Sequence, residues 1–229
     1  MDSRPLTQAV LADQSLDSRT RMILVAEGLF AKEGIDAVSL RQVAAAAGQK
    51  NHNAVQYHFG TREGLVQAIF DYRMQQMEEC RLDMLAAAEA EDRLGDPRTI
   101  ADIIFKPQLS VIRDLGDTSY ANFLCQYLLR NSDAEFGRFG GNLPAGLTRV
   151  MGLLRAQLDF LNGSAAQRRL ITACFMFLNL LAVYTRDLES GRAREDFAEA
   201  LEDTLQQIIA ALFLPFAGNQ APTIPPAGC

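Results

Sequence analysis

The sequence predicts an all-α fold. Apolar residues recur with the helical period in nearly every segment, glycines punctuate the chain, and the alternation typical of strands is absent. The 229 residues could form one large domain or two modest ones, and a hydrophobic content of 48% is ample for a core. We expect about nine helices, over residues 17–34, 39–47, 51–59, 61–90, 97–115, 118–131, 144–161, 165–189 and 193–214.

A capping box predicts where the second helix begins. The Ser39 side chain can accept a hydrogen bond from the Gln42 amide, while the Gln42 side chain can reach back to the Ser39 amide. Gly48 ends this helix, since glycine takes the left-handed cap conformation without cost. Between them, apolar residues form one short stripe: Leu40, Val43, Ala44 and Ala47.

The third segment combines three inward apolar residues, Ala54, Val55 and Phe59, with an unusual number of polar ones. The residues left facing outward are Gln49, Lys50, Asn51, His52, Asn53, Gln56, Tyr57 and His58. Asn and Gln can form paired hydrogen bonds to adenine, Lys can bond guanine, and Tyr, His and Ser can hold phosphate oxygens. A solvated loop would also carry such residues. Their position after a capped helix and a glycine favours a helix-turn-helix that binds DNA.

From about Thr20 to Tyr72 the chain resembles the DNA-binding domain of the tetracycline-repressor (TetR) family of bacterial transcription regulators. The motifs that carry the resemblance are AEGLFAKEGIDAVSL, RQVAAAAG, the YHF at Tyr57 to Phe59, and GTREGLVQAIF. The resemblance implies DNA contacts at Arg41 and Gln42, phosphate contacts at Tyr57 and His58, and a basic residue, Arg62, opening the next helix. The full set of predicted DNA-binding residues is Ser39, Arg41, Gln42, Lys50, Asn51, His52, Asn53, Gln56, Tyr57, His58 and Arg62.

Two features depart from the family pattern. The turn between Gly48 and Tyr57 is one residue longer than is usual, and Gln56 stands where the family commonly has a second aromatic residue. The register of the recognition helix is therefore open by one residue. Which of the polar residues from Lys50 to Gln56 read bases, and which line a phosphate, also stays open.

The charge distribution is compatible with DNA binding. The net charge is −6, but the residues before Gln75 hold eight Lys and Arg against eight Asp and Glu, so all the excess acid follows them. DNA binding depends on the local field of the docking face rather than on the sum over the chain. A neutral head predicts weak binding to random DNA.

Other classes of protein find little support. The only histidines, His52 and His58, lie in the predicted recognition segment, and no Ser/His/acid set, phosphate loop or metal-ligand spacing occurs elsewhere, so we expect no enzyme, cofactor or metal site. Four cysteines lie far apart and are expected to be buried or idle thiols. No run of 18 apolar residues predicts a membrane span, and the protein is expected in the cytoplasm.

Four parts are predicted: a flexible arm at 1–16, the helix-turn-helix domain at 17–60, a helical ligand-binding and dimerisation domain at 61–214, and a disordered tail at 215–229. Pro97 and Pro144 fit the first turn of a helix, and Ser164 with Gln167 predicts a second capping box. The helix over 61–90 would link the head to the body, so that a change in its tilt moves the recognition helix.

The resemblance implies that the last two helices form a homodimer and that the body binds a small molecule. Both helices are more apolar than one core face needs, although a monomer core would explain the same stripes. The predicted dimer residues are Leu178, Leu181, Ala182, Leu201, Leu205, Ile208, Ile209 and Leu212, with Phe175 beside them.

For the ligand pocket we predict aromatic walls with sparse polar groups, which suit an apolar or amphipathic effector. Ordinary core packing is the equal alternative for each residue. The predicted pocket residues are Phe105, Tyr120, Phe123, Gln126, Tyr127, Phe175, Asn179 and Tyr184. The predicted function is a ligand-responsive repressor on a palindromic operator. The alternative is an all-helical module that binds a small molecule or a protein.

Overall fold

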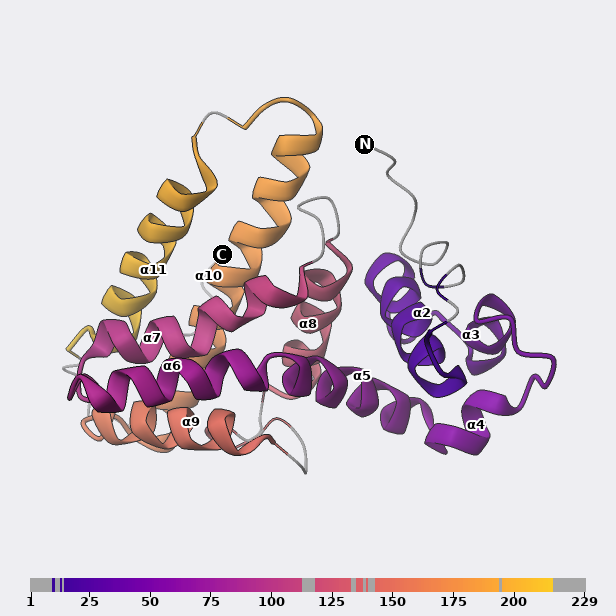
Figure 1. Ribbon diagram of the computed structural model, residues 1–229, viewed down its shortest axis with the longest axis horizontal. Coiled ribbons are helices and arrows are strands. Elements are labelled where there is room, and N and C mark those ends of the chain that lie inside the picture. The colour runs from indigo at the N-terminus through magenta and orange to yellow at the C-terminus, as the bar shows by residue number, and fades with distance from the viewer. Residues whose placement is uncertain are drawn as a thin grey trace, which may run out of the picture.

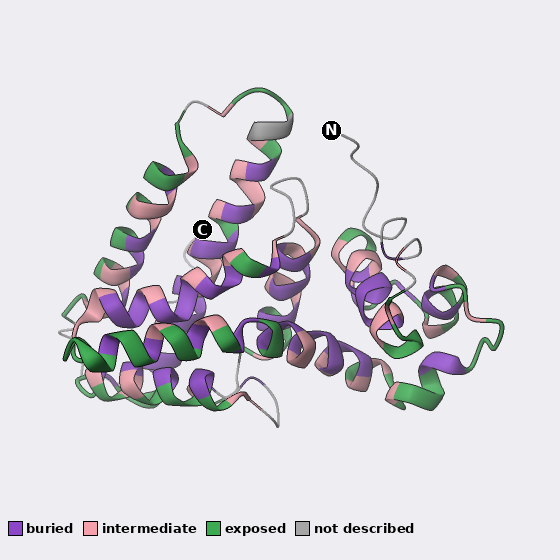
Figure 2. Ribbon diagram, viewed as in Figure 1, coloured by how far each residue is buried: buried purple, intermediate pink, exposed green. Residues whose placement is uncertain are grey.

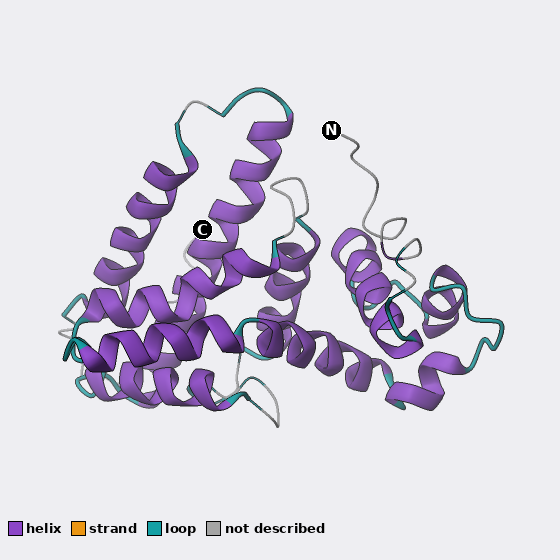
Figure 3. Cartoon of the chain, in the orientation of Figure 1, coloured by secondary structure: helices purple, strands orange, loops and turns teal. Residues whose placement is uncertain are grey.

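The computed structural model describes residues 10, 13, 15–112, 118–132, 135–137, 139, 143–193 and 195–215. These residues form ten α-helices and one 3-10 helix, with no strand among them, which confirms the all-α prediction (Figures 1 and 3). Most of the predicted N-terminal arm and nearly all of the predicted tail lie outside the described residues. The elements are α2 (Ser18–Glu33), α3 (Leu40–Ala46), α4 (Ala54–Phe59), α5 (Arg62–Gln76), α6 (Glu78–Ala90), α7 (Pro97–Phe105), η1 (Lys106–Val111), α8 (Ser119–Arg130), α9 (Ala145–Gln157), α10 (Gly163–Glu189) and α11 (Phe197–Phe213).

Local capping accounts for the small N-terminal head formed by α2, α3 and α4. Asp17 caps α2 by accepting from the Thr20 amide at 2.8 Å. The predicted capping box of α3 is confirmed, because Ser39 accepts from the Gln42 amide and Gln42 accepts from the Ser39 amide. Gly48 has φ +70°, the left-handed conformation that the sequence predicted.

The third helix begins later than predicted, at Ala54 instead of residue 51. The side chain of Asn51 accepts a hydrogen bond from the Asn53 amide at 2.9 Å, and its carbonyl accepts from the Ala54 amide at 3.0 Å. Such a turn, closed by an asparagine side chain, competes with helix formation. Residues 51–53 therefore belong to the turn before α4.

Two predicted long helices are divided in the structure. The helix predicted over 61–90 is two helices, α5 and α6, which meet at Met77. No glycine or proline lies at this break, so the sequence pattern predicted one continuous helix. The helix predicted over 97–115 ends at Phe105 and passes into η1, because Pro107 has no amide hydrogen to continue the ladder.

The body uses caps that come from elsewhere in the chain. The predicted second capping box is wrong: Asn162 accepts from the Ala165 amide at 2.8 Å, while Gln167 is buried and accepts from the Gly137 amide at 3.2 Å. At the start of α9, the buried carboxylate of Glu78 on α6 accepts from the Gly146 amide. Glu78 thus caps α9 from a neighbouring helix.

Head and body share one core, which Figure 2 shows as buried residues running through both parts. The pair Glu27–Arg73 joins α2 to α5 inside it: the guanidinium donates to both carboxylate oxygens, at 2.7 and 2.5 Å. Only 6% of the Arg73 side chain and none of the Glu27 side chain is exposed. Burial disfavours the charged form of Arg73, but the Glu27 carboxylate outweighs that effect and raises the pKa of the guanidinium.

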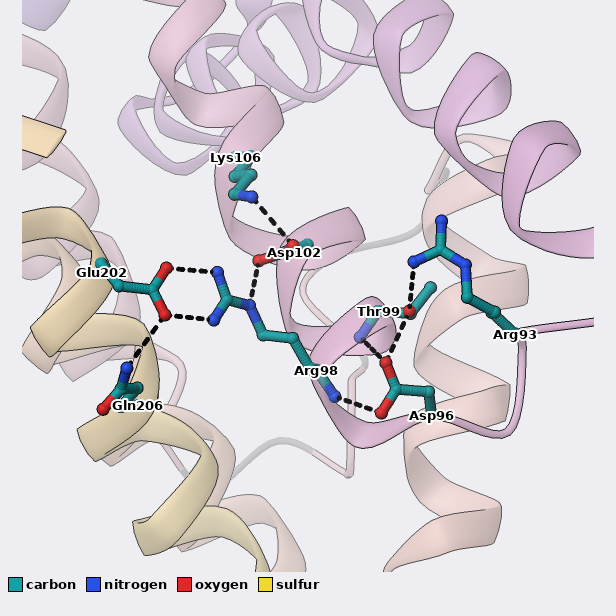
Figure 4. Close-up of polar contacts among 8 residues, drawn as sticks. All are labelled: Arg93, Asp96, Arg98, Thr99, Asp102, Lys106, Glu202 and Gln206. Carbon is teal, nitrogen blue, oxygen red and sulfur yellow. Dashed lines mark hydrogen bonds and ion pairs between the residues drawn. The ribbon is translucent and has the colours of Figure 1, made fainter. Parts of the chain in front are cut away.

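A surface network ties α7 to α11 (Figure 4). The Arg98 guanidinium donates to both oxygens of Glu202 at 2.5 and 2.6 Å and to Asp102 at 2.9 Å. These hydrogen bonds lower the pKa of Glu202 to about 2. Asp102 also accepts from Lys106 at 2.8 Å. The C-terminal helix is thereby held to the helix that follows the α6–α7 turn.

Helix α10 packs against α8 and α11. Its stretch Gly163–Asp187 is the one described segment long and apolar enough to cross a membrane, with a mean hydropathy of 1.3. Core helices of soluble proteins meet the same criterion, and Phe177 and Leu178 of this helix lie in the core. The expectation of no membrane span stays a prediction.

Candidate nucleic-acid interface

The helix-turn-helix, α3 and α4, lies at one outer end of the molecule (Figure 1). Ala54 and Val55 of α4 are buried, whereas Gln56, Tyr57 and His58 are exposed. Tyr57 is 85% exposed, with its ring 5.2 Å from that of His58 in an edge-to-face arrangement. An aromatic side chain so exposed gains nothing from burial in the free chain, so its hydroxyl is available to a partner.

The turn before α4 adds further exposed groups. Lys50, Asn51, His52 and Asn53 are all exposed, and they directly precede the first residue of α4. Asn53 occupies the cap position but makes no capping hydrogen bond with its side chain. The structure thus brings together the predicted residues from 50 to 58 on one short turn and helix.

The angle between α4 and α5 is determined by three residues at the elbow. Gly60 has φ +72°, and the Thr61 side chain caps α5 by accepting from the Gly64 amide at 3.1 Å. A Cβ atom at Gly64 would lie 2.1 Å from the carbonyl oxygen of Phe59. Only glycine fits there, so Gly64 is a residue needed to orient the recognition helix that sequence reasoning did not single out.

Three of the predicted DNA-binding residues are engaged inside the head. Ser39 and Gln42 are exposed but hydrogen-bond each other in the α3 cap. Arg62 is half-buried and donates to the carbonyls of Ile35 and Val38, the latter at 2.8 Å. Arg62 therefore holds the loop between α2 and α3. Arg41, in contrast, is exposed at the start of α3.

The predicted dimer residues fall into two groups. Five of them are buried in the core of the single chain: Leu178, Leu181, Leu205, Ile208 and Leu212. Ala182, Leu201, Ile209 and Phe175 keep part of their surface exposed. No second chain is present, so the interface on these two helices stays a prediction.

The structure places the eight predicted pocket residues in different parts of the body. Phe105, Tyr120, Phe123 and Tyr127 are buried in the core. The Tyr120 hydroxyl lies 3.2 Å from Gln108 Oε1, and the Tyr127 hydroxyl lies 2.9 Å from Gln67 Oε1 and 3.0 Å from the Phe139 carbonyl. Burial raises the pKa of both phenols.

Asn179 and Tyr184 lie elsewhere, in an open groove of about 740 Å³ between α10 and α11. Apolar residues of α10 form much of one wall, and polar residues of α11 contribute to the other: Met176, Leu180, Val183, Thr204 and Gln207. The Tyr184 hydroxyl donates to the Glu195 carbonyl at 3.2 Å, and its ring packs edge-to-face on Phe197.

Gln126, the remaining predicted pocket residue, lies at the junction of head and body. Its side chain contacts the end of α2, and four residues further along α8, Arg130 pairs with Asp36 at 2.7 Å. Neither residue forms part of a motif, since these contacts span more than 90 residues of sequence. The sequence predicted a pocket position for Gln126 because this polar residue stands between the aromatic residues Phe123 and Tyr127.

Comparisons with known proteins agree with this geometry. The model of the family described as bacterial regulatory proteins, tetR family, matches residues 23–69. No curated protein matches the chain. Six chains of solved structures do match; one, described as "Molecular basis for control of antibiotic production by a bacterial hormones", is 21% identical, with a TM-score of 0.39, over 86% of this chain and 98% of that chain.

The matched residues run from the first turns of α2 into α5 and contain the whole helix-turn-helix. The predicted family is thereby confirmed. Residues 23–69 are thus a DNA-binding domain of the tetR family of bacterial regulatory proteins, and the chain is a DNA-binding transcriptional regulator.

Proposed function

We propose that the protein is a ligand-responsive repressor that binds a palindromic operator as a homodimer in the cytoplasm. The exposed residues from Lys50 to His58 carry this proposal. Amide side chains in the turn and on α4 supply base contacts, and Tyr57 and His58 supply phosphate contacts. Arg41 at the exposed start of α3 is a further candidate for the phosphate backbone.

A dimer is proposed because one recognition helix of six residues offers few base contacts. Two heads spaced by about one turn of DNA, roughly 34 to 36 Å, would read a palindrome together. The groove between α10 and α11 and the half-exposed apolar residues around it support an interface there: Phe175, Met176, Leu180, Ala182, Val183, Leu201 and Ile209.

The effector is proposed to be an apolar or amphipathic molecule that binds in the body. Support comes from polar groups buried among its aromatic residues: Arg81, Gln108 and Tyr120. The Nε atom of Arg81 is a buried donor with no partner among the described residues. An effector with an acceptor oxygen would satisfy it. Linkage then requires operator and effector to weaken each other by the same factor.

The test of DNA recognition is selection of bound sequences from a random duplex library at about 0.15 M salt. Wild-type protein runs beside an Asn53→Ala, Gln56→Ala double variant and a Tyr57→Phe variant. A palindrome enriched by the wild type and lost by the double variant supports the proposal. Tyr57→Phe should weaken binding to all sequences alike, since phosphate contacts carry no base preference.

Failure of the wild type to enrich any sequence would contradict operator binding and favour the all-helical module. Salt dependence separates the two further. Phosphate contacts make log affinity fall with log salt by about 0.9 per contact, whereas an apolar protein interface responds weakly.

A further inference from the structure

Side chains of α8, a helix of the body, bind the end of α2 and the loop between α2 and α3. Gln126 on α8 accepts from the Ile35 amide with Oε1 at 2.9 Å and donates from Nε2 to the Phe30 carbonyl at 2.9 Å. Arg130, one turn along, donates to both oxygens of Asp36 at 2.7 Å. Figure 1 shows α8 standing between α10 and the head helix α2.

These contacts act on backbone that has little freedom of its own. Ile35 and Val38 are 2% and 0% exposed, and Gly34 has φ +98°. Arg62 holds the carbonyls of Ile35 and Val38 from the other side. Because Ser39, the cap of α3, follows at once, the helix-turn-helix cannot turn relative to α8 without breaking the Gln126 bonds.

We propose that Gln126, supported by Arg130, is a positioning residue for DNA recognition: it holds the head at the angle to the body that sets the spacing between half-sites. This inference rests on the proposed dimeric operator binding. Neither residue lies on the surface of α4, so neither is expected to touch bases.

Gln126 contributes more to this restraint than Arg130 does. Its side chain is half-buried, and both of its bonds are to backbone atoms whose positions follow the fold of the head. Asp36 is 80% exposed, and exposed ion pairs contribute little. Substitution of Arg130 should therefore have a smaller effect than substitution of Gln126.

The experiment compares Gln126→Met, which keeps the length of the side chain and removes both hydrogen bonds, with Asn122→Leu one turn earlier on α8. Asn122 donates to the Thr118 hydroxyl at 3.1 Å, four residues earlier in the chain and not in the head, so it serves as the matched control. Affinity is measured for the selected palindrome and for duplexes with the half-sites moved one base pair closer or further apart.

Wild type and Asn122→Leu should favour the selected spacing by the same factor. In Gln126→Met that factor should fall roughly fivefold, in keeping with the loss of one to two neutral hydrogen bonds. The slope of log affinity against log salt should not change, because the phosphate contacts are retained. Equal weakening of all three duplexes, or no change in the spacing preference, would overturn the proposal.

Amide hydrogen exchange, measured without DNA, tests whether Gln126 restrains the loop between α2 and α3. The Ile35 amide should exchange roughly tenfold faster in Gln126→Met and at the wild-type rate in Asn122→Leu. An unchanged rate would overturn the proposal whatever the DNA result. Gln126→Glu, which keeps the acceptor for Ile35 and loses the donor to Phe30, provides an intermediate variant should the methionine chain fold poorly. The two experiments can also give different results. If the wild type selects no palindrome but the Ile35 amide exchanges faster in Gln126→Met, the proposed operator function is wrong, while the restraint by Gln126 is supported.

Discussion

The buried pair Glu27–Arg73 is the interaction whose loss should most disturb the joint between head and body. We consider Arg73→Met, Glu27→Leu and the double variant. Arg73→Met leaves a carboxylate with no exposed surface and without its two guanidinium hydrogen bonds. Glu27→Leu leaves the nearly buried guanidinium of Arg73 without its two hydrogen bonds to the carboxylate. The double variant replaces both charges with apolar side chains of similar size.

The magnitude follows from the asymmetry of buried ion pairs. Removing one partner costs about 3–5 kcal/mol, because the remaining charge stays desolvated, whereas replacing both by apolar residues is close to neutral. For a chain of this size about 1 kcal/mol corresponds to roughly 2–4 °C in the unfolding temperature. Each single variant should therefore melt roughly 6–20 °C below wild type, and the double variant within a few degrees of it.

The assay is thermal unfolding followed by circular dichroism at pH 5 and pH 8, at fixed protein concentration. Folded Arg73→Met must protonate Glu27 to keep it buried, whereas its unfolded chain releases that proton at neutral pH. The stability of this variant is therefore present at low pH and falls as pH rises, so its deficit relative to wild type should shrink at pH 5. A single variant that melts with wild type at both pH values, or a double variant no better than the singles, would refute the reasoning.

Three other outcomes are expected. Gly146→Ala should destabilise the protein by about 1–3 kcal/mol, because the added Cβ would lie 2.9 Å from the carboxylate that caps α9. Gly152→Ala, in open space on the same helix, should instead stabilise it by about 0.4–1 kcal/mol. Urea unfolding measures both free energies. Carbon NMR titration should place the pKa of Glu202 at about 2 in wild type and higher in Arg98→Met, so the Arg98–Glu202 ion pair is present at neutral pH and is lost as pH falls toward 2; equal titration in both proteins would contradict it. Burial raises the pKa of the half-buried Cys174 thiol to about 12, so iodoacetamide at pH 8 should label it much more slowly in the native protein than after denaturation, and equal rates by mass spectrometry would count against this.

The helix-turn-helix was predictable because its signals are local. A capping box needs only residues three apart, and Gly48 was expected to be left-handed because it ends a helix. The error at the start of α4 had a local cause too, since the Asn51 side chain closed a turn that competes with the helix. Pro107 likewise ended α7 by a rule that can be read from one residue.

The faces of α10 and α11 could not be assigned in the same way. Apolar residues surround most of both helices, so the pattern could not tell which stripe is buried in the core of the chain and which keeps exposed surface. Leu205, Ile208 and Leu212 proved to be core residues, and Phe175 and Ile209 kept exposed surface. That choice depends on where α8 packs on α10 and where α7 packs on α11.

The sequence by itself determined the all-α class, the DNA-binding head and the position of its recognition segment, because helical period, caps and turn residues act within a few residues of one another. Only the tertiary structure decided how the head is held: Glu27 finds Arg73, Gln126 finds Ile35, and Glu78 caps α9 across separations of 46, 91 and 68 residues. The side chains of Glu27, Arg73, Gln126 and Glu78 are of common polar types, and no local spacing along the chain links any of them to its partner. Such a pair acquires its energy only when folding removes water from both groups, so its meaning lies in the packed structure and not in the local pattern.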